Sequence, residues 1–183
     1  MKLPIEPLSR NEALALVDAC HSGRNTGLRN QALLAVLWRS HLRIGEALAL
    51  RPTDYAGDRL RVLHGKGGNT RVVGVDNQTR ELIDQWLLVR PASEYLFCTG
   101  KGNQMGQSYV RHLFKRLQEK TGVQKRCHPH GMRHTGTSEL AREGVPVIHI
   151  STQLGHRHVS STDGYIRQFC PEDVIRIIKK RVW

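Results

Sequence analysis

Two arginines lie where the sequence changes from loop to helix, Arg43 in HLRIGE and Arg133 in HGMRHT. The planar guanidinium group suits bidentate hydrogen bonding to phosphate oxygens, and a helix N-terminus adds N–H donors. Taken singly, each arginine is also explained by an ion pair with a carboxylate such as Glu46. Phosphate binding and a structural ion pair therefore both stand as interpretations of each arginine by itself.

Three histidines accompany these arginines. His130 lies three residues before Arg133, His134 follows Arg133 directly, and His156 stands in the tripeptide LGH. Histidine acts as a general acid or base near neutral pH, or donates a hydrogen bond to a phosphoryl oxygen. His130 and His134 have the spacing of a helical metal pair, but no HExxH motif surrounds them. We therefore predict that no metal is bound, and a loop or helix-cap role is the alternative for each histidine.

A lysine and a tyrosine complete the reactive residue types. Lys66 stands in the glycine-rich stretch GKGG, where a flexible side chain could protonate a leaving oxygen or simply be a solvated turn lysine. Tyr165 could be a nucleophile or a half-buried phenol. Because the pKa of a free phenol is about 10, a nucleophilic tyrosine needs cations and a base close to it.

The size and charge of the chain limit what surrounds these residues. The chain has 183 residues, of which 39% are hydrophobic, and this matches one domain at roughly 100–200 residues per domain. Lys and Arg total 28 against 16 Asp and Glu, for a net charge of +12. Such a balance predicts a polyanionic partner, usually nucleic acid, and an ordinary basic enzyme is the alternative.

The composition also predicts where in the cell the protein acts. No apolar run approaches the roughly 18 residues of a membrane span, so we predict no membrane association. The cysteines Cys20, Cys98, Cys127 and Cys170 are scattered and form no CxxC pair. Free thiols in a reducing cytoplasm fit this spacing.

Periodicity predicts a mainly α fold with one small antiparallel β-sheet. Ser9 and Glu12 have the spacing of a capping box ahead of an apolar helical stretch. Alternation predicts a hairpin of residues 58–65 and 70–75 with Lys66 at its tip, and a short strand at 94–98. Helical patterns cover residues 9–20, 28–40, 44–51, 78–90, 107–122, 128–144, 146–156 and 170–183.

Four separated motifs carry a resemblance. In chain order they read HLRIGEALALRPTDY, HGKGGNTRVVGV, HPHGMRHTGTSELAREGVPVIHISTQLGH and SSTDGYIR. Together they closely resemble the catalytic domain of tyrosine recombinases, the phage-integrase family that includes Xer-type enzymes, from about Leu8 to Ile178. The resemblance implies the following catalytic residues: Arg43, Lys66, His130, Arg133, His156 and the nucleophile Tyr165. It implies supporting roles for Glu46 and His134.

The resemblance also implies the reaction. Tyr165 would attack a scissile DNA phosphate, the arginines and His156 would stabilise the transition state, and Lys66 would protonate the 5′-oxygen. His130 would take part in proton transfer. The expected function is site-specific recombination of double-stranded DNA by a homotetramer, with no cofactor, metal or ATP.

The chain departs from the family pattern in three ways. Ser40 and His41 stand where Thr-Gly is common, and Met132 replaces a leucine. We also expect residues 1–183 to form a single catalytic domain without the usual N-terminal core-binding domain. The alternatives are a catalytically degenerate DNA-binding or accessory protein, and a DNA-relaxing activity of type IB. The sequence argues against degeneracy, because every catalytic position is filled.

Overall fold

The computed structural model describes residues 7–63 and 70–155. The chain divides into two compact units, residues 1–136 and 137–183, and the boundary falls inside helix α6 (Pro129–Arg142). The described residues form seven α-helices and a two-stranded antiparallel sheet, which confirms the predicted fold class. None of these helices is long and apolar enough to cross a membrane. That residues 1–183 are one domain stays a prediction.

Helix α1 (Arg10–Ala19) begins at the predicted capping box. The Ser9 hydroxyl accepts a hydrogen bond from the Glu12 backbone N–H at 3.2 Å, and the Glu12 carboxylate accepts from the Ser9 N–H at 2.6 Å. These two bonds satisfy N–H groups that a helix start leaves without an intrahelical partner. The start of this helix is therefore encoded in its local sequence.

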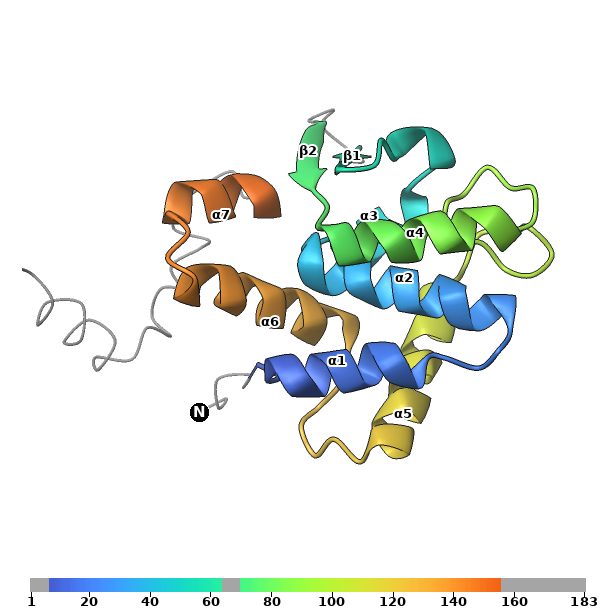
Figure 1. The fold of residues 1–183 in the computed structure, drawn as a ribbon, viewed down its shortest axis with the longest axis horizontal. Coiled ribbons are helices and arrows are strands. Elements are labelled where there is room, and N and C mark those ends of the chain that lie inside the picture. Colours follow the sequence, from blue (N-terminus) through green and yellow to red (C-terminus); the bar gives the residue numbers. More distant parts are fainter. Residues whose placement is uncertain (1–6, 64–69, 156–183) are drawn as a thin grey trace, which may run out of the picture. The chain divides into compact units, whose positions relative to one another are not determined.

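Helix α2 (Asn25–Arg39) is the central element of the first unit. It packs against both α1 and α4 (Asn77–Val89) and lies between them (Figure 1). Leu33, Leu34 and Leu37 are fully buried, as a helix covered on several faces requires. Helix α5 (Gln107–Thr121) packs against α1 and ends at Gly122, whose φ of +70° is readily adopted by glycine.

Three short elements follow α2 and position the site. They are α3 (Ile44–Ala49), the 3-10 helix η1 (Pro52–Asp54) and the hairpin of β1 (Arg59–Val62) with β2 (Arg71–Gly74). Arg59 pairs with Gly74 and Val62 with Arg71, which confirms the predicted hairpin. Its tip, with Lys66, lies outside the described residues.

The predicted strand at residues 94–98 is wrong. Leu96, Phe97 and Cys98 are fully buried, but the segment contributes only an isolated bridge from Cys98 to Gln104. The Leu96 N–H donates to the Leu50 carbonyl at 2.7 Å, and side chains donate to two of the segment's carbonyl groups. The Trp86 indole donates to the Leu96 carbonyl at 2.8 Å, and Arg29 donates to the Cys98 carbonyl at 3.0 Å.

Described by itself, the second unit comprises the end of α6 and helix α7 (Val147–Leu154). Ala141, Ile150 and Leu154 form its small core. Helix α7 ends at Gly155, whose φ is +66°. The helix predicted at 170–183 lies outside the described residues. Cys20, Cys98 and Cys127 are buried free thiols, as predicted, and Cys170 falls outside the described ranges.

Candidate active site

One carboxylate, that of Glu46, lies at the centre of three arginines. Its Oε1 atom accepts a hydrogen bond from Arg43 Nη1 at 3.0 Å, and Arg71 donates one bond to each oxygen at 2.9 Å. Arg133 Nη1 lies 3.7 Å from Oε2. We call Arg43, Glu46, Arg71 and Arg133 the Glu46 cluster.

Local structure places the first pair of this cluster. Arg43 is the N-cap of α3 and Glu46 is the third residue of that helix, so Glu46 reaches back to the Arg43 backbone N–H at 2.8 Å. This is the carboxylate half of a capping box, and it explains the three-residue spacing of the two side chains. The side chain of Arg43 is 47% exposed, whereas that of Glu46 is only 10% exposed.

The hairpin contributes Arg71, which the sequence analysis did not identify. Strand β2 carries it to Glu46, and its side chain is 11% exposed. The two parallel hydrogen bonds are the bidentate geometry that a guanidinium group makes with a carboxylate. Arg71 stands shortly after Lys66 in the motif HGKGGNTRVVGV, and this position could have indicated a role in the site.

Arg133 is held by the backbone of the turn after α2. Its side chain is 2% exposed, and its Nη1 atom donates to the carbonyl of His41 at 2.7 Å. His41 has a φ of +60°, a conformation uncommon for residues other than glycine. This is the position at which the sequence departs from the family's Thr-Gly. The departure keeps the glycine-like backbone and adds a buried imidazole.

Close packing of α6 against the end of α2 places Arg133 next to this turn. A Cβ atom at Gly136 would lie 1.9 Å from the Trp38 carbonyl oxygen and 2.9 Å from His41 Nε2. The start of α6 is also fixed, because His128 Nδ1 accepts the Gly131 N–H at 3.0 Å. Neither role was predicted from the sequence, because both depend on the start and packing of α6.

The charged groups of the cluster shift each other's ionisation. Burial opposes the charged form of Glu46, but hydrogen bonds from Arg71 and Arg43 outweigh it and lower its pKa to about 2. Burial, followed by the positive charges of Arg133 and Arg43, lowers the pKa of His130. The lowered pKa favours the neutral imidazole, which is the form that accepts a proton.

A model of the phage integrase family matches residues 6–170. The chain belongs to this family. It is 31% identical over 169 residues to tyrosine recombinase XerC of Pelobacter propionicus, covering 90% of this chain and 55% of that protein. It is 33% identical over 149 residues to XerC of Bacillus licheniformis, covering 76% and 49%. The chain therefore spans about half the length of the curated relatives it matches.

Solved structures of recombinases have the same fold. A crystal structure of XerA recombinase matches with a TM-score of 0.85 at 24% identity, over 100% of this chain and 68% of that one. The XerH site-specific recombinase, bound to a palindromic difH substrate after cleavage, matches with a TM-score of 0.80 at 22% identity. That match covers 98% of this chain and 54% of XerH.

The structure brings together four of the residues that the family resemblance indicates: Arg43, Glu46, His130 and Arg133. His134 follows Arg133 on α6 and is half-buried, and its supporting role stays a prediction. Lys66, His156 and Tyr165 lie outside the described residues, so their roles stay predictions. Across residues 7–63 and 70–155, no three metal-ligating side chains gather as a metal site would require.

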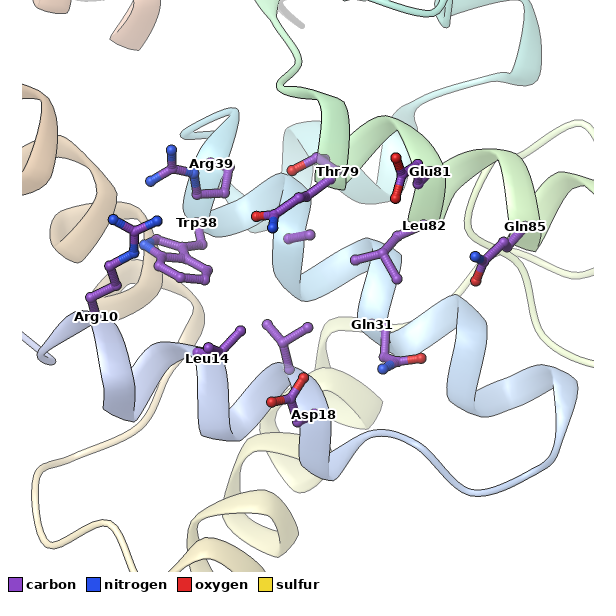
Figure 2. Close-up of a pocket in the computed structure, with 13 residues that line it drawn as sticks. Arg10, Leu14, Asp18, Gln31, Trp38, Arg39, Thr79, Glu81, Leu82 and Gln85 are labelled. Carbon is purple, nitrogen blue, oxygen red and sulfur yellow. The ribbon is translucent and has the colours of Figure 1, made fainter.

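A separate cavity of about 290 Å³ lies among α1, α2 and α4 (Figure 2). It contains none of the residues that the family resemblance indicates. Its lining mixes charges of both signs with an apolar surface, and Arg39 at its rim pairs with Asp76 at 2.8 Å. The labelled charged residues are Arg10, Asp18, Arg39 and Glu81. This mixture does not favour a phosphate ligand.

Proposed function

We propose that this chain is the catalytic domain of a site-specific DNA recombinase that cuts and rejoins strands through a 3′-phosphotyrosyl intermediate. The observation that carries the proposal is the Glu46 cluster, in which family-indicated Arg43 and Arg133 are held by the same carboxylate. Membership of the phage integrase family supports it. The relatives named above are tyrosine recombinases.

The charge of the cluster suits phosphoryl transfer. Three guanidinium groups around one carboxylate give the cluster an excess of positive charge. In the transition state, negative charge spreads over the non-bridging oxygens of the phosphate, and fixed cations stabilise it without reorganising. Glu46 sets the positions of these cations, and the excess of positive charge is available to the DNA.

Arg43 is suited to direct contact with the phosphate. Nearly half of its side chain is exposed, and it uses Nη1 for Glu46. Among the described residues, its Nη2 and Nε atoms have no acceptor. Arg133 is buried and fixed by the His41 carbonyl, so it would reach a phosphate only from a position set by the protein.

The remaining steps rest on the family resemblance. Tyr165 attacks the phosphorus atom, the bond to the 5′-oxygen breaks, and Lys66 protonates that oxygen. The product is a 3′-phosphotyrosyl link and a free 5′-hydroxyl group. Attack by a second strand's 5′-hydroxyl reverses the step, so the bond energy is kept and no nucleotide is consumed. His156 donates to a phosphoryl oxygen, and His130 accepts the phenol proton of Tyr165 during the attack and returns it when the strands are rejoined.

The partner in this proposal is double-stranded DNA, bound by a tetramer in the cytoplasm. The net charge of +12 supports a polyanionic substrate. Helix α5 has buried apolar residues on one side and an exposed side that is largely basic, a pattern that suits contact with a DNA groove. The exposed basic residues of α5 are Arg111, His112, Lys115, Arg116 and Lys120.

A covalent-capture experiment with many DNA sequences at once tests the proposal. A pool of nicked duplexes with randomised cores is incubated with the protein, and covalent adducts are isolated under denaturing conditions and sequenced. We expect adducts with the wild type and none with Tyr165→Phe. Tyr55→Phe is the matched control, because it also removes one phenol hydroxyl, and that hydroxyl donates to Asp84, which is not part of the Glu46 cluster.

Three other outcomes of this experiment would contradict the proposal or part of it. An adduct that survives Tyr165→Phe overturns the assigned nucleophile. Duplex binding with no adduct from the wild type supports an accessory DNA-binding protein instead. Relaxation of supercoiled plasmid without any preferred sequence supports a type IB activity.

A further inference from the structure

A second group of cations lies at the other end of α2 from the Glu46 cluster. A hollow of about 510 Å³ is bounded by the end of α1, the following loop, the first turns of α2 and α5. Its lining includes three cations and three hydroxyl groups, and it includes no carboxylate. These residues are Arg24, Arg116, Lys120, Ser22, Thr26 and Tyr109, and we call them the basic hollow.

In the part of the chain that the structure describes, the cations of the basic hollow form no ion pair. Within residues 7–63 and 70–155, no Asp or Glu side chain forms an ion pair with Arg24, Arg116 or Lys120. Lys120 donates to the carbonyl of Ala19 at 2.8 Å, which is a neutral partner. Among the described residues, no carboxylate therefore neutralises these three positive charges.

A fourth positive charge lies behind this surface. Arg29 is 3% exposed, and its guanidinium group donates to neutral acceptors: the Cys98 carbonyl at 3.0 Å, the Asn30 amide oxygen and the Tyr109 hydroxyl at 2.6 Å. Burial lowers the pKa of Arg29, as expected for a buried cation, because desolvation disfavours the charged form. A guanidinium group remains protonated in proteins, so its charge adds to the field in the hollow.

Tyr109 connects this buried charge to the hollow. Its hydroxyl oxygen accepts hydrogen bonds from Arg29 Nη2 at 2.6 Å and from Asn30 Nδ2 at 3.3 Å. A phenol oxygen that accepts twice still has one hydrogen to donate, and no described residue accepts it. The guanidinium carbons of Arg29 and Arg116 also lie 4.9 Å and 5.7 Å from the centre of the Tyr109 ring. The hollow thus combines excess positive charge with a hydroxyl donor that no described side chain or carbonyl accepts from.

We propose that the basic hollow binds a phosphate group of the DNA backbone outside the cleavage centre. This inference rests on the proposed function. The ligand must be an anion with several acceptor oxygens, because the lining offers cations and hydroxyl donors. The hollow lies at the first turns of α2, and this 15-residue helix ends at Arg39, which is close in sequence to Arg43 of the Glu46 cluster. The length of α2 therefore approximates the distance between the two sites. At 1.5 Å per residue this is about 20 Å, roughly six nucleotides at 3.4 Å each.

The test measures how duplex binding depends on salt. For B-DNA, each phosphate contact contributes about 0.9 to the slope of log affinity against log salt concentration. We expect Arg116→Gln with Lys120→Gln to reduce that slope by about one to two. Lys101→Gln with Arg80→Gln removes the same charge from exposed residues outside the hollow and should leave the slope unchanged.

Two further measurements distinguish the sources of the phosphate. In an NMR titration with inorganic phosphate, a DNA-backbone site should show only weak chemical-shift changes at the hollow that do not saturate. Saturation there, with no change in the salt slope of the variant, would mean that the hollow takes a free anion and overturns the DNA assignment. An unchanged slope and no phosphate shifts overturn the site altogether. Thermal melting of each variant checks that it is folded.

Failure of this inference is separable from failure of the proposed function. Duplex binding is measured without cleavage, so a reduced slope supports the basic hollow even if no covalent adduct forms. Conversely, an adduct that depends on Tyr165, together with an unchanged slope, supports the recombinase and removes only the second phosphate site.

Discussion

The Glu46 cluster and the basic hollow are both rich in cations, but only the first contains a carboxylate. In the Glu46 cluster, hydrogen bonds of 2.9–3.0 Å fix Arg43 and Arg71 on the same side chain. In the basic hollow, Arg24, Arg116 and Lys120 have no such partner among the described residues. The carboxylate of Glu46 neutralises one unit of positive charge, and its contacts fix the positions of the surrounding guanidinium groups.

This difference separates two ways of binding phosphate. Stabilising a transition state requires donors already aimed at the developing charge, and a shared carboxylate provides that order. Holding a DNA backbone requires net positive charge more than exact geometry, because the energy comes largely from released counter-ions. We therefore expect substitutions in the two regions to have different effects on stability, cleavage and binding.

The largest expected effect comes from removing the central carboxylate. Glu46→Gln takes away the negative charge that three guanidinium groups share, and breaking a buried ion pair in this way costs about 3–5 kcal/mol. We expect the low end, because Arg43 is half exposed. Glu94→Gln is the matched control, since its ion pair with Arg51 is more than half exposed on both sides and contributes about 0–1 kcal/mol. Urea unfolding at low salt measures both.

The second prediction concerns the turn that holds Arg133. Burial, the largest influence, lowers the pKa of His41 to about 4 from the ordinary 6.5. The unfolded chain therefore binds the proton more readily, and stability that is fully present above pH 6.5 is lost as the pH falls towards 4. The titration of His41 is expected to lower the free energy of unfolding by about 3 kcal/mol, at roughly 1.36 kcal/mol for each pKa unit.

His41→Asn provides the comparison for this pH dependence. Asparagine tolerates a positive φ but does not titrate in this range. The free energy of unfolding of this variant, measured between pH 7 and pH 4.5, should fall less steeply than that of the wild type. Identical slopes would mean that His41 is not the buried titrating group.

The third prediction asks whether fixed geometry matters within the Glu46 cluster. Arg71→Lys keeps the charge but loses the bidentate pair with Glu46. We expect the rate of covalent-adduct formation to fall about tenfold, which corresponds to about 1.4 kcal/mol, while duplex affinity stays the same. Arg59→Lys, which alters an exposed pair with Asp58, should change neither quantity. A matching loss of affinity would indicate that Arg71 binds DNA rather than positioning Glu46.

The smallest expected effect concerns Arg24 in the basic hollow. Because it has no described partner, Arg24→Gln should change the free energy of unfolding by less than about 0.5 kcal/mol. It should weaken duplex binding a few-fold at low salt, and the difference should vanish at high salt. Denaturation and fluorescence anisotropy measure the two effects. A large loss of stability would show that Arg24 is structural.

Local signals allowed part of this structure to be predicted. The Ser9–Glu12 capping box, the Gly122 helix end and the hairpin depend on residues close in sequence, and all three are observed. Arg43 with Glu46 also follows from local spacing. The strand expected at 94–98 failed because strand formation requires a partner strand, and periodicity does not show whether one exists.

Long-range contacts account for what the sequence did not reveal. Arg71 meets Glu46 across 25 residues, and Arg133 meets the His41 carbonyl across 92. Behind the basic hollow, the hydrogen bond from Arg29 to Tyr109 joins α2 to α5 across 80 residues. Nothing in the local pattern of these arginines distinguishes a guanidinium that pairs with a carboxylate from one that does not. Only the tertiary structure does so.

The segment ahead of α1 has a practical consequence for protein engineering. The Leu8 backbone N–H donates to Thr135 Oγ1 at 3.0 Å, and Lys125 Nζ donates to the Pro7 carbonyl at 3.3 Å. Leu8 itself is 2% exposed. A module fused upstream, such as a programmable DNA-reading array, would thus be tethered at a defined point beside α6. Linker libraries should vary residues before Pro7 and leave residues 7–9 intact.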